Sequence, residues 1–311
     1  MAASPRARCE RGQATPEWVA LALLIALLFL AAFAKLEPLR LGLSLARAIG
    51  SNLLCAVRVA DTCGEGSELD AAYGAELAAA VRRHAPDVLY EQGMRALPVD
   101  FRSCRAAVCS DGPGEGTVWR SHSGEPATAF VHLIDCRTGS ASSAAADCSG
   151  SRAENAYLQY WFYYPQSATL RGVPVAGDRG RHADDWESVQ IRVGPGGRAE
   201  TRASSHHGYN YGGGAVNWAS DAGIGTLNAF AEAVGARAPS GWGPETGLLF
   251  VSGGSHAGKA SGEPLRYPRH TPASRLRLIA LESLAADGAR FAVTPPWLKE
   301  VWHDPEAAQT G

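Results

Sequence analysis

The side chains best suited to binding or catalysis lie at residues 181–187, which read R-H-A-D-D-W-E. This segment follows a Gly/Pro-rich stretch and leads into E-S-V-Q-I-R-V, whose alternation predicts a half-buried strand. In a strand Asp185 and Glu187 share one face, and Trp186 points to the other, where it can enter a core. His182, at the loop edge, can fold back over the carboxylate face. Carboxylates this close repel each other unless a positive charge neutralises them.

A divalent cation would neutralise this set directly. The oxygen-rich ligands favour a hard ion, Mg²⁺ or Ca²⁺ first and Mn²⁺ next, over zinc. The competing interpretation makes Asp184, Asp185 and Glu187 solvated turn charges and His182 a surface residue. Because charged clusters are common at strand starts, the spacing alone does not decide between the two.

Three segments in chain order resemble a known family. Y-L-Q-Y-W-F-Y-Y-P, H-A-D-D-W-E-S-V-Q-I and S-S-H-H-G-Y are similar to the necrosis- and ethylene-inducing protein-like family, whose hallmark is G-H-R-H-D-W-E followed by S-x-H-G-G-Y. The chain also resembles the vacuolar protein sorting-associated protein 62 family, which shares the D-W-E strand and adds a late G-S-H-A element. G-S-H-A stands at residues 254–257, which places the chain nearer the second family. The resemblance covers roughly residues 157–258.

The resemblance implies an ion site in a β-sandwich. The heptad's first histidine, its aspartate and its glutamate bind a divalent cation in the necrosis-inducing family, which here implies His182, Asp185 and Glu187 as ligands. Asp178 is the candidate for a further ligand, and three residues would surround the ligands: His206, Asp184 and His256. Arg181 and Asp184 depart from the heptad, which argues against cytolytic activity but leaves the ion site.

Two other motifs suggest rival chemistry. Residues 253–259 fit G-x-x-x-x-G-K, but Ala260 stands where a phosphate loop needs Ser or Thr for Mg²⁺. Ser255 lies in an approximate nucleophile elbow, with Asp287 and His303 following in the order of a hydrolase triad. Because the βα repeats of that fold are missing upstream, we do not favour a serine hydrolase.

The N-terminal sequence has the features of a membrane-targeting or export signal. Arginines precede an apolar run at residues 18–34, which predicts a cytoplasmic N-terminus and an exported remainder. The A-x-A at residues 32–34 would suit a cleaved signal peptide. Alternatively, Gly12 and Glu17 resemble the processing site of type IV prepilins and tight-adherence pseudopilins, in which cleavage after the glycine leaves a retained membrane helix. We favour the retained helix.

The organisation expected from this reading has four parts. They are a cytoplasmic leader (1–12), a transmembrane or signal helix (13–35), a stalk helix (36–60) and an exported domain (61–311). The protein would then be a single-pass cell-membrane protein with an extracytoplasmic domain, or secreted. Its net charge of −2 gives no basic footprint, so nucleic-acid binding has no electrostatic support.

Six of the seven cysteines follow the apolar run as close pairs. An even number of cysteines beyond an export signal suits disulfides in an oxidising compartment. Six cysteines allow 15 connectivities. Nearest-neighbour pairing is our prediction: Cys55–Cys63, Cys104–Cys109 and Cys136–Cys148.

The fold class expected is β-rich α+β, an antiparallel β-sandwich with flanking helices plus the N-terminal membrane helix. Strands are expected at residues 88–90, 127–135, 157–164, 187–193, 248–252 and 275–282, and helices at residues 67–81 and 226–234. The aromatic stretch 157–164 is apolar on both faces, which predicts a central strand covered on both sides.

Three function classes follow. The first, which we favour, is a cation-dependent surface module that binds an envelope lipid head group or glycan. The second is a metal-dependent hydrolase with His206 as base. The third is a structural minor pilin. The implied partners are the membrane through the N-terminal helix, and pilus or secretion machinery.

Overall fold

The computed structural model describes residues 66–137, 146–168, 181–205, 208–211, 241–262, 267–282 and 288–307. The described residues from Glu68 onward belong to one compact unit, Glu68–Gly311. The expected membrane and stalk helices, the helix at 226–234, and the following single residues lie outside the described ranges: Gly12, Glu17, Cys55, Cys63, Asp178 and His206. Within those ranges no helix combines the length and apolar character needed to cross a bilayer.

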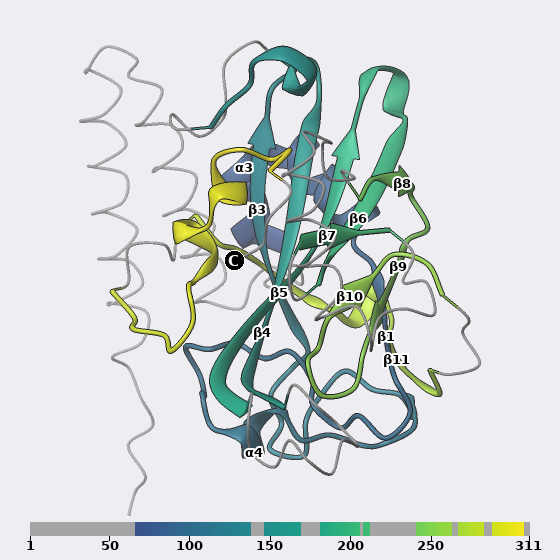
Figure 1. The fold of residues 1–311 in the computed structure, drawn as a ribbon, viewed down its shortest axis with the longest axis vertical. Helices are drawn as coiled ribbons and strands as arrows, with labels where there is room; N and C mark the ends of the chain where they lie inside the picture. The colour runs from purple at the N-terminus through teal and green to yellow at the C-terminus, as the bar shows by residue number, and fades with distance from the viewer. Residues whose placement is uncertain are drawn as a thin grey trace, which may run out of the picture. The chain divides into compact units, whose positions relative to one another are not determined.

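The larger sheet contains the strand that carries the candidate ligands (Figure 1). Its strand order is β12-β3-β4-β5-β6-β7, and β8 also pairs with β6. The bounds are β12 (Arg277–Ala280), β3 (Thr128–Asp135), β4 (Ala156–Ala168), β5 (Arg181–Val193), β6 (Ala199–Ser205), β7 (Gly208–Asn210) and β8 (Gly243–Pro244). The β3-β4-β5-β6-β7 pairings are antiparallel, whereas β12 pairs with β3 in parallel.

The smaller sheet has the order β10-β9-β1-β11-β2. The bounds are β10 (Gly258–Lys259), β9 (Leu248–Val251), β1 (Asp87–Tyr90), β11 (Arg269–Thr271) and β2 (Gly116–Thr117). Two of its pairings, β1 with β9 and β11 with β2, are parallel. The β-rich class is therefore confirmed, but both sheets are mixed rather than antiparallel. Alternation along a strand indicates which face is buried but not which distant strand becomes its neighbour, or in which direction.

Helices are few in the described chain. They are α3 (Gly66–Arg83), α4 (Ala107–Ser110) and the 3₁₀ turns η1 (Gly150–Arg152), η2 (Pro195–Gly197), η4 (Ala273–Arg275), η5 (Pro296–Leu298) and η6 (Glu300–Trp302). The helix predicted at residues 67–81 is confirmed as α3, whose Leu69 and Val81 are buried. Gly74 adopts φ 77° and interrupts the helical geometry there.

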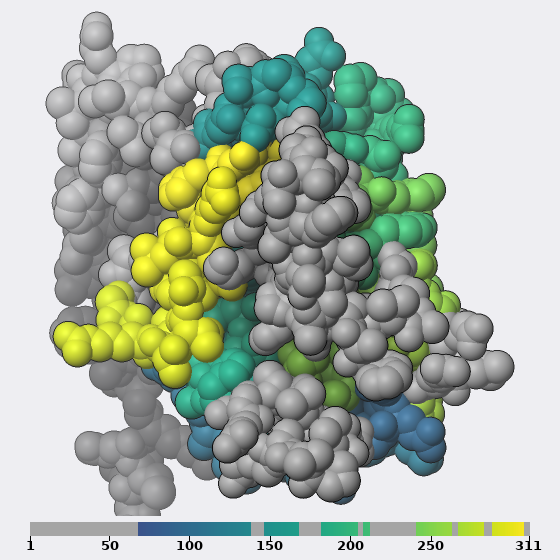
Figure 2. All heavy atoms as spheres, in the orientation of Figure 1, coloured from purple at the N-terminus to yellow at the C-terminus, as the bar shows by residue number. Residues whose placement is uncertain are grey.

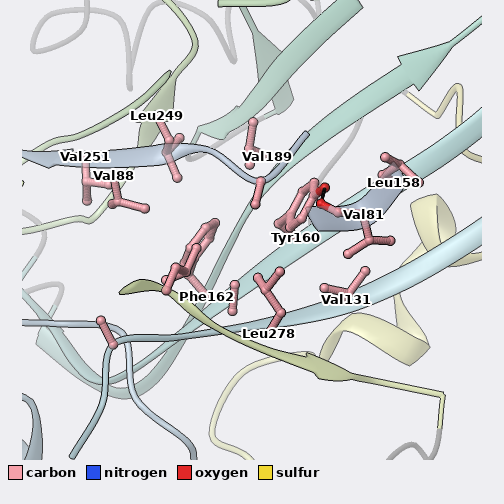
Figure 3. Close-up of a cluster of buried hydrophobic side chains, with 14 of the residues drawn as sticks. Val81, Val88, Val131, Leu158, Tyr160, Phe162, Val189, Leu249, Val251 and Leu278 are labelled. Carbon is pink, nitrogen blue, oxygen red and sulfur yellow. Dashed lines mark hydrogen bonds between the residues drawn. The ribbon is translucent and has the colours of Figure 1, made fainter. Parts of the chain in front are cut away.

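One apolar core joins both sheets and α3 (Figure 3). Its labelled members point toward one another from β1, β3, β4, β5, β9, β12 and α3: Val88, Val131, Leu158, Tyr160, Phe162, Val189, Leu249, Val251, Leu278 and Val81. The Tyr160 hydroxyl donates a hydrogen bond of 2.6 Å to the carbonyl of Val81, so the polar end of this buried ring is satisfied.

A second core lies on the opposite face of the larger sheet. Trp161 and Tyr163 of β4 point into it together with Trp186 of β5, while Tyr160 and Phe162 point into the first core. All five side chains are at most 4% exposed. The prediction that the aromatic stretch is a central strand covered on both faces is confirmed.

Two disulfides brace the described chain, Cys104–Cys109 and Cys136–Cys148, as predicted. The C-terminal segment, defined here as residues 295–307, is part of the yellow band on the surface in Figure 2. It contains η5 and η6, and its Trp302 packs against the second core.

Candidate functional site

Strand β5 positions the two central carboxylates on one face. Asp185 is paired with Tyr164 of β4 and Glu187 with Phe162, and both partners belong to the first core. Trp186 between them belongs to the second core. The sheet therefore places the carboxylates as the strand alternation predicts.

Asp185 is 8% exposed and has a histidine partner. Its Oδ2 lies 2.7 Å from Nδ1 of His256, which follows β9 in a turn and is 4% exposed. Because an ionised carboxylate only accepts hydrogen bonds, Nδ1 of His256 carries the proton in this pair. The His256 ring stacks on Tyr164, with ring centroids 3.9 Å apart and planes 14° from parallel. The stack and the hydrogen bond together fix the imidazole.

Glu187 accepts a hydrogen bond of 2.5 Å from the hydroxyl of Ser204 on β6. That hydroxyl in turn accepts the backbone N–H of Ser188 at 2.6 Å, so the neighbouring strand orients the carboxylate. Lys299 of the C-terminal segment interacts electrostatically with both carboxylates. Burial lowers the pKa of Lys299, while the negative charges of Glu187 and Asp185 act in the opposite direction.

Tyr164 lies opposite Asp185 on the neighbouring strand β4. Burial, followed by Tyr90 and then by the nearby charges of Asp185 and Glu187, raises its pKa well above the usual value. Its hydroxyl is buried and has no hydrogen-bond partner within the described chain. Tyr164 therefore stays neutral at physiological pH.

His182 is held by the backbone at the start of β5. Its Nδ1 lies 2.8 Å from the carbonyl oxygen of Asp184, which can only accept, so Nδ1 is the donor. In the neutral tautomer Nε2 then keeps its lone pair. This is the hydrogen-bond pattern that metal-binding histidines use to fix their orientation.

The Asp184 side chain makes contacts on the second-core side of the sheet. Its carboxylate accepts bonds of 2.7 Å from Arg105 Nη2, 2.6 Å from the Tyr163 hydroxyl and 2.7 Å from the Ala292 backbone N–H. Burial by itself would raise the pKa of Asp184, but these donors outweigh it and hold the pKa below its usual value. Asp184 thus anchors the start of β5 to the Cys104–Cys109 loop and to the chain near Ala292.

Two neighbours of Asp185 have an unusual backbone conformation: Asp184 precedes it in the chain, and His256 is its hydrogen-bond partner. Asp184 and His256 both have φ 56°, in the left-handed region that non-glycine residues rarely adopt. Such conformations persist only where surrounding contacts impose them, and they concentrate at functional sites. The contacts of Asp184 with Arg105 and of His256 with Asp185 supply that constraint here.

The donor set suits a hard cation, with two carboxylates and an oriented imidazole. Within the described ranges, however, no three His, Cys, Asp or Glu side chains gather closely enough to hold a metal ion. The expected contributors Asp178 and His206 lie outside those ranges, so the ion site stays a prediction.

The rival triad is not assembled among the described residues. The Ser255 hydroxyl lies 3.5 Å from the hydroxyl of Ser252, and His303 is exposed. Asp287 falls outside the described ranges.

Three contributors had no recognisable signal in the sequence. Arg105 and Lys299 belong to no motif, and Ser204 begins the S-S-H-H-G-Y segment without a role that the motif assigns to it. Arg105 and Ser204 hydrogen-bond to carboxylates of β5, and Lys299 interacts electrostatically with Glu187 and Asp185. Only the position of Arg105 inside a short cysteine loop hinted at a structural constraint.

Comparisons with known proteins found only weak similarity. No protein-family model matches the chain, and no curated protein matches it. Solved structures that match include one described as "Toxin fold for microbial attack and plant defense", with 17% identity over 44% of this chain and 54% of that one, at a TM-score of 0.25. The non-toxic HaNLP3 protein matches with 15% identity over 43% of this chain and 54% of that one, at 0.24. NLPPya in complex with mannosamine matches with 14% identity over 72% and 86%, at 0.31.

The chain thus spans about half the length of the first two of these structures. TM-scores of this size do not establish a shared fold, so no property of these proteins is transferred to the chain.

Proposed function

We propose that the protein is an exported binding module whose Asp185–Glu187 face takes a divalent cation and, through it, a glycan or lipid head group of the cell envelope. The observation that carries the proposal is the placement of two carboxylates on one face of β5, with Asp185 buried against His256. Two such charges attract a cation strongly, because burial weakens their screening by water.

The surrounding chemistry supports a hard ion. Carboxylate oxygens are the ligands that Ca²⁺ and Mg²⁺ prefer, and such ions keep open positions for sugar hydroxyls or phosphate oxygens. The hydrogen bond from His182 Nδ1 to a backbone carbonyl leaves Nε2 as a further donor atom. The two disulfides favour an oxidising, extracytoplasmic compartment.

Metal binding by the purified chain tests the ion. We expect calorimetry to detect Ca²⁺ or Mg²⁺ binding to the wild type, and Asp185→Asn and Glu187→Gln to weaken it by about tenfold or more, because each removes a charged ligand. Asp70→Asn is the matched control, since Asp70 is an exposed carboxylate on α3 that pairs with Arg82. Equal metal content in all four proteins would rule the ion site out.

Ligand binding tests the second half of the proposal. The chain is applied to an array of neutral, acidic and amino sugars and to vesicles with anionic head groups, each with and without chelator. Retention that chelator and Glu187→Gln both abolish would support a cation-bridged ligand. Retention that neither treatment changes would place the binding surface elsewhere.

A further inference from the structure

A row of polar side chains crosses the second-core face of the larger sheet. His132 on β3 pairs with Gln159 on β4, Gln159 with Gln190 on β5, and Gln190 with Arg202 on β6. All four side chains, here called the polar row, are 0% exposed. Because a buried polar group is costly unless it is hydrogen-bonded, the partners of the polar row show what this face is built to hold.

Three members of the polar row hydrogen-bond to the main chain of the C-terminal segment. His132 Nε2 lies 3.1 Å from the carbonyl oxygen of Trp302, and Gln159 Nε2 donates to that of Val301 at 2.7 Å. Arg202 Nη2 donates to two further carbonyl oxygens of the segment, those of Pro305 and Ala307, at 2.8 and 2.9 Å. Gln190 completes the row by accepting from Arg202 Nε at 2.9 Å.

Two side chains of the segment fit specific partners on the same face. The Trp302 indole stacks on the His132 ring, with centroids 3.5 Å apart and planes 7° from parallel. Four residues later, Glu306 accepts hydrogen bonds from three donors at 2.7–2.8 Å: Arg192, Tyr157 and Trp242. The segment therefore presents an aromatic anchor and an acidic anchor.

The charge of Arg202 is adapted to this role. Burial lowers its pKa to about 10, so the guanidinium remains charged at neutral pH. It lies over the rings of Tyr209 and Trp242, at 4.0 and 4.5 Å from their centroids. A buried cation held by aromatic faces and directed at carbonyl oxygens is a strong donor for a bound main chain.

Proteins that bind peptides combine the same two kinds of contact. Main-chain hydrogen bonds give affinity, and fitted side chains give specificity. Among the described elements the segment contains only the 3₁₀ turns η5 and η6 and pairs with no strand, so side chains of the sheet hold it.

We propose that the polar row and the partners of Glu306 form a peptide-binding groove whose ligand is the segment at residues 295–307, and that the groove binds this segment without a covalent link. The ligand class is a peptide with a tryptophan and, four residues later, a glutamate. In this structure the chain fills its own groove. This inference is carried by residues other than the candidate ligands of the ion site.

The experiment begins with the full chain, so that folding is complete before the segment is released. A protease site is placed between Glu282 and Gly288, and the purified protein is then cut. We expect the cut fragment to remain bound in size-exclusion chromatography. We also expect an excess of labelled peptide with the sequence of residues 289–307 to replace it, and a scrambled peptide not to do so.

Variants of the labelled peptide test the two anchors, and because they are not part of the folded body they cannot unfold it. Trp302→Ala and Glu306→Gln should each weaken binding about tenfold or more, as the loss of an anchor does. Leu298→Ala is the control: Leu298 is 70% exposed, so its removal should leave binding unchanged.

Three outcomes would overturn the inference. The body could lose its circular dichroism signal on cutting, which would make the segment an inseparable part of the core. The fragment could leave a folded body that then takes up no labelled peptide. Leu298→Ala could weaken binding as much as Trp302→Ala, which would show that the anchors carry no specificity.

Discussion

His256 Nδ1 lies 2.7 Å from Asp185 Oδ2, which joins two buried side chains 71 positions apart in the chain. The contact ties the turn after β9, in the smaller sheet, to β5 in the larger one. It therefore positions Asp185 and also connects the two sheets.

We expect His256→Ala to destabilise the fold by about 1–3 kcal/mol, because it leaves the buried Asp185 carboxylate without its donor. Asp185→Ala alone should cost a similar amount, and the double variant less than the sum of the two. Urea unfolding of the four proteins measures this coupling. Strict additivity would mean that the two side chains do not interact in solution.

Asp184→Asn tests the anchor at the start of β5. The variant should lose roughly 2–4 kcal/mol at neutral pH, somewhat below the cost of breaking a fully buried pair, because the Arg105 side chain is 37% exposed. The pKa of Asp184 is lowered in the folded state. Its contribution is therefore complete above the unfolded pKa of about 3.9 and is lost as the pH falls through the folded value.

Urea unfolding of wild type and Asp184→Asn across the acidic range checks this sign. The stability difference should be constant from about pH 5 to 7 and shrink below about pH 4. A difference that grew on acidification would contradict the assignment of Asp184 as an ionised acceptor.

Gly241→Ala should destabilise the protein by about 1–3 kcal/mol. Gly241 has φ 73°, and an added Cβ would lie 2.7 Å from the carbonyl oxygen of Tyr209, which is backbone and cannot rotate away. Gly114→Ala is the control, since an added Cβ there meets nothing within 4 Å. Thermal unfolding of both variants gives the comparison, and equal melting temperatures would refute the predicted clash.

Loss of the Cys136–Cys148 disulfide should lower stability by about 3 kcal/mol, because the unfolded chain regains the freedom of a loop closed over 12 positions. The double Cys→Ser variant is compared with wild type by urea unfolding without reductant. Reductant should lower the stability of the wild type at least to that of the variant. It should lower it further because reductant also opens Cys104–Cys109.

The sequence alone determined features that repeat along one segment. The aromatic stretch within β4 is apolar on both faces, and the structure covers it on both. The alternation of β5 assigned Asp185 and Trp186 to opposite faces, and the closeness of Cys104 to Cys109 indicated their pairing. These inferences hold because side-chain direction in a strand and the closure of short loops depend on neighbouring residues only.

Tertiary structure decided which distant residues meet. The parallel neighbours of β1 and β3, the Asp185–His256 pair and the contact of His132 with Trp302, 170 positions away, appear in no local pattern. Each of these contacts depends on how the elements pack over both faces of the sheets. A short stretch of sequence contains only one of the two partners. The polar row shows this most clearly: its four residues lie on separate strands, and only pairing in register aligns them beneath the C-terminal segment.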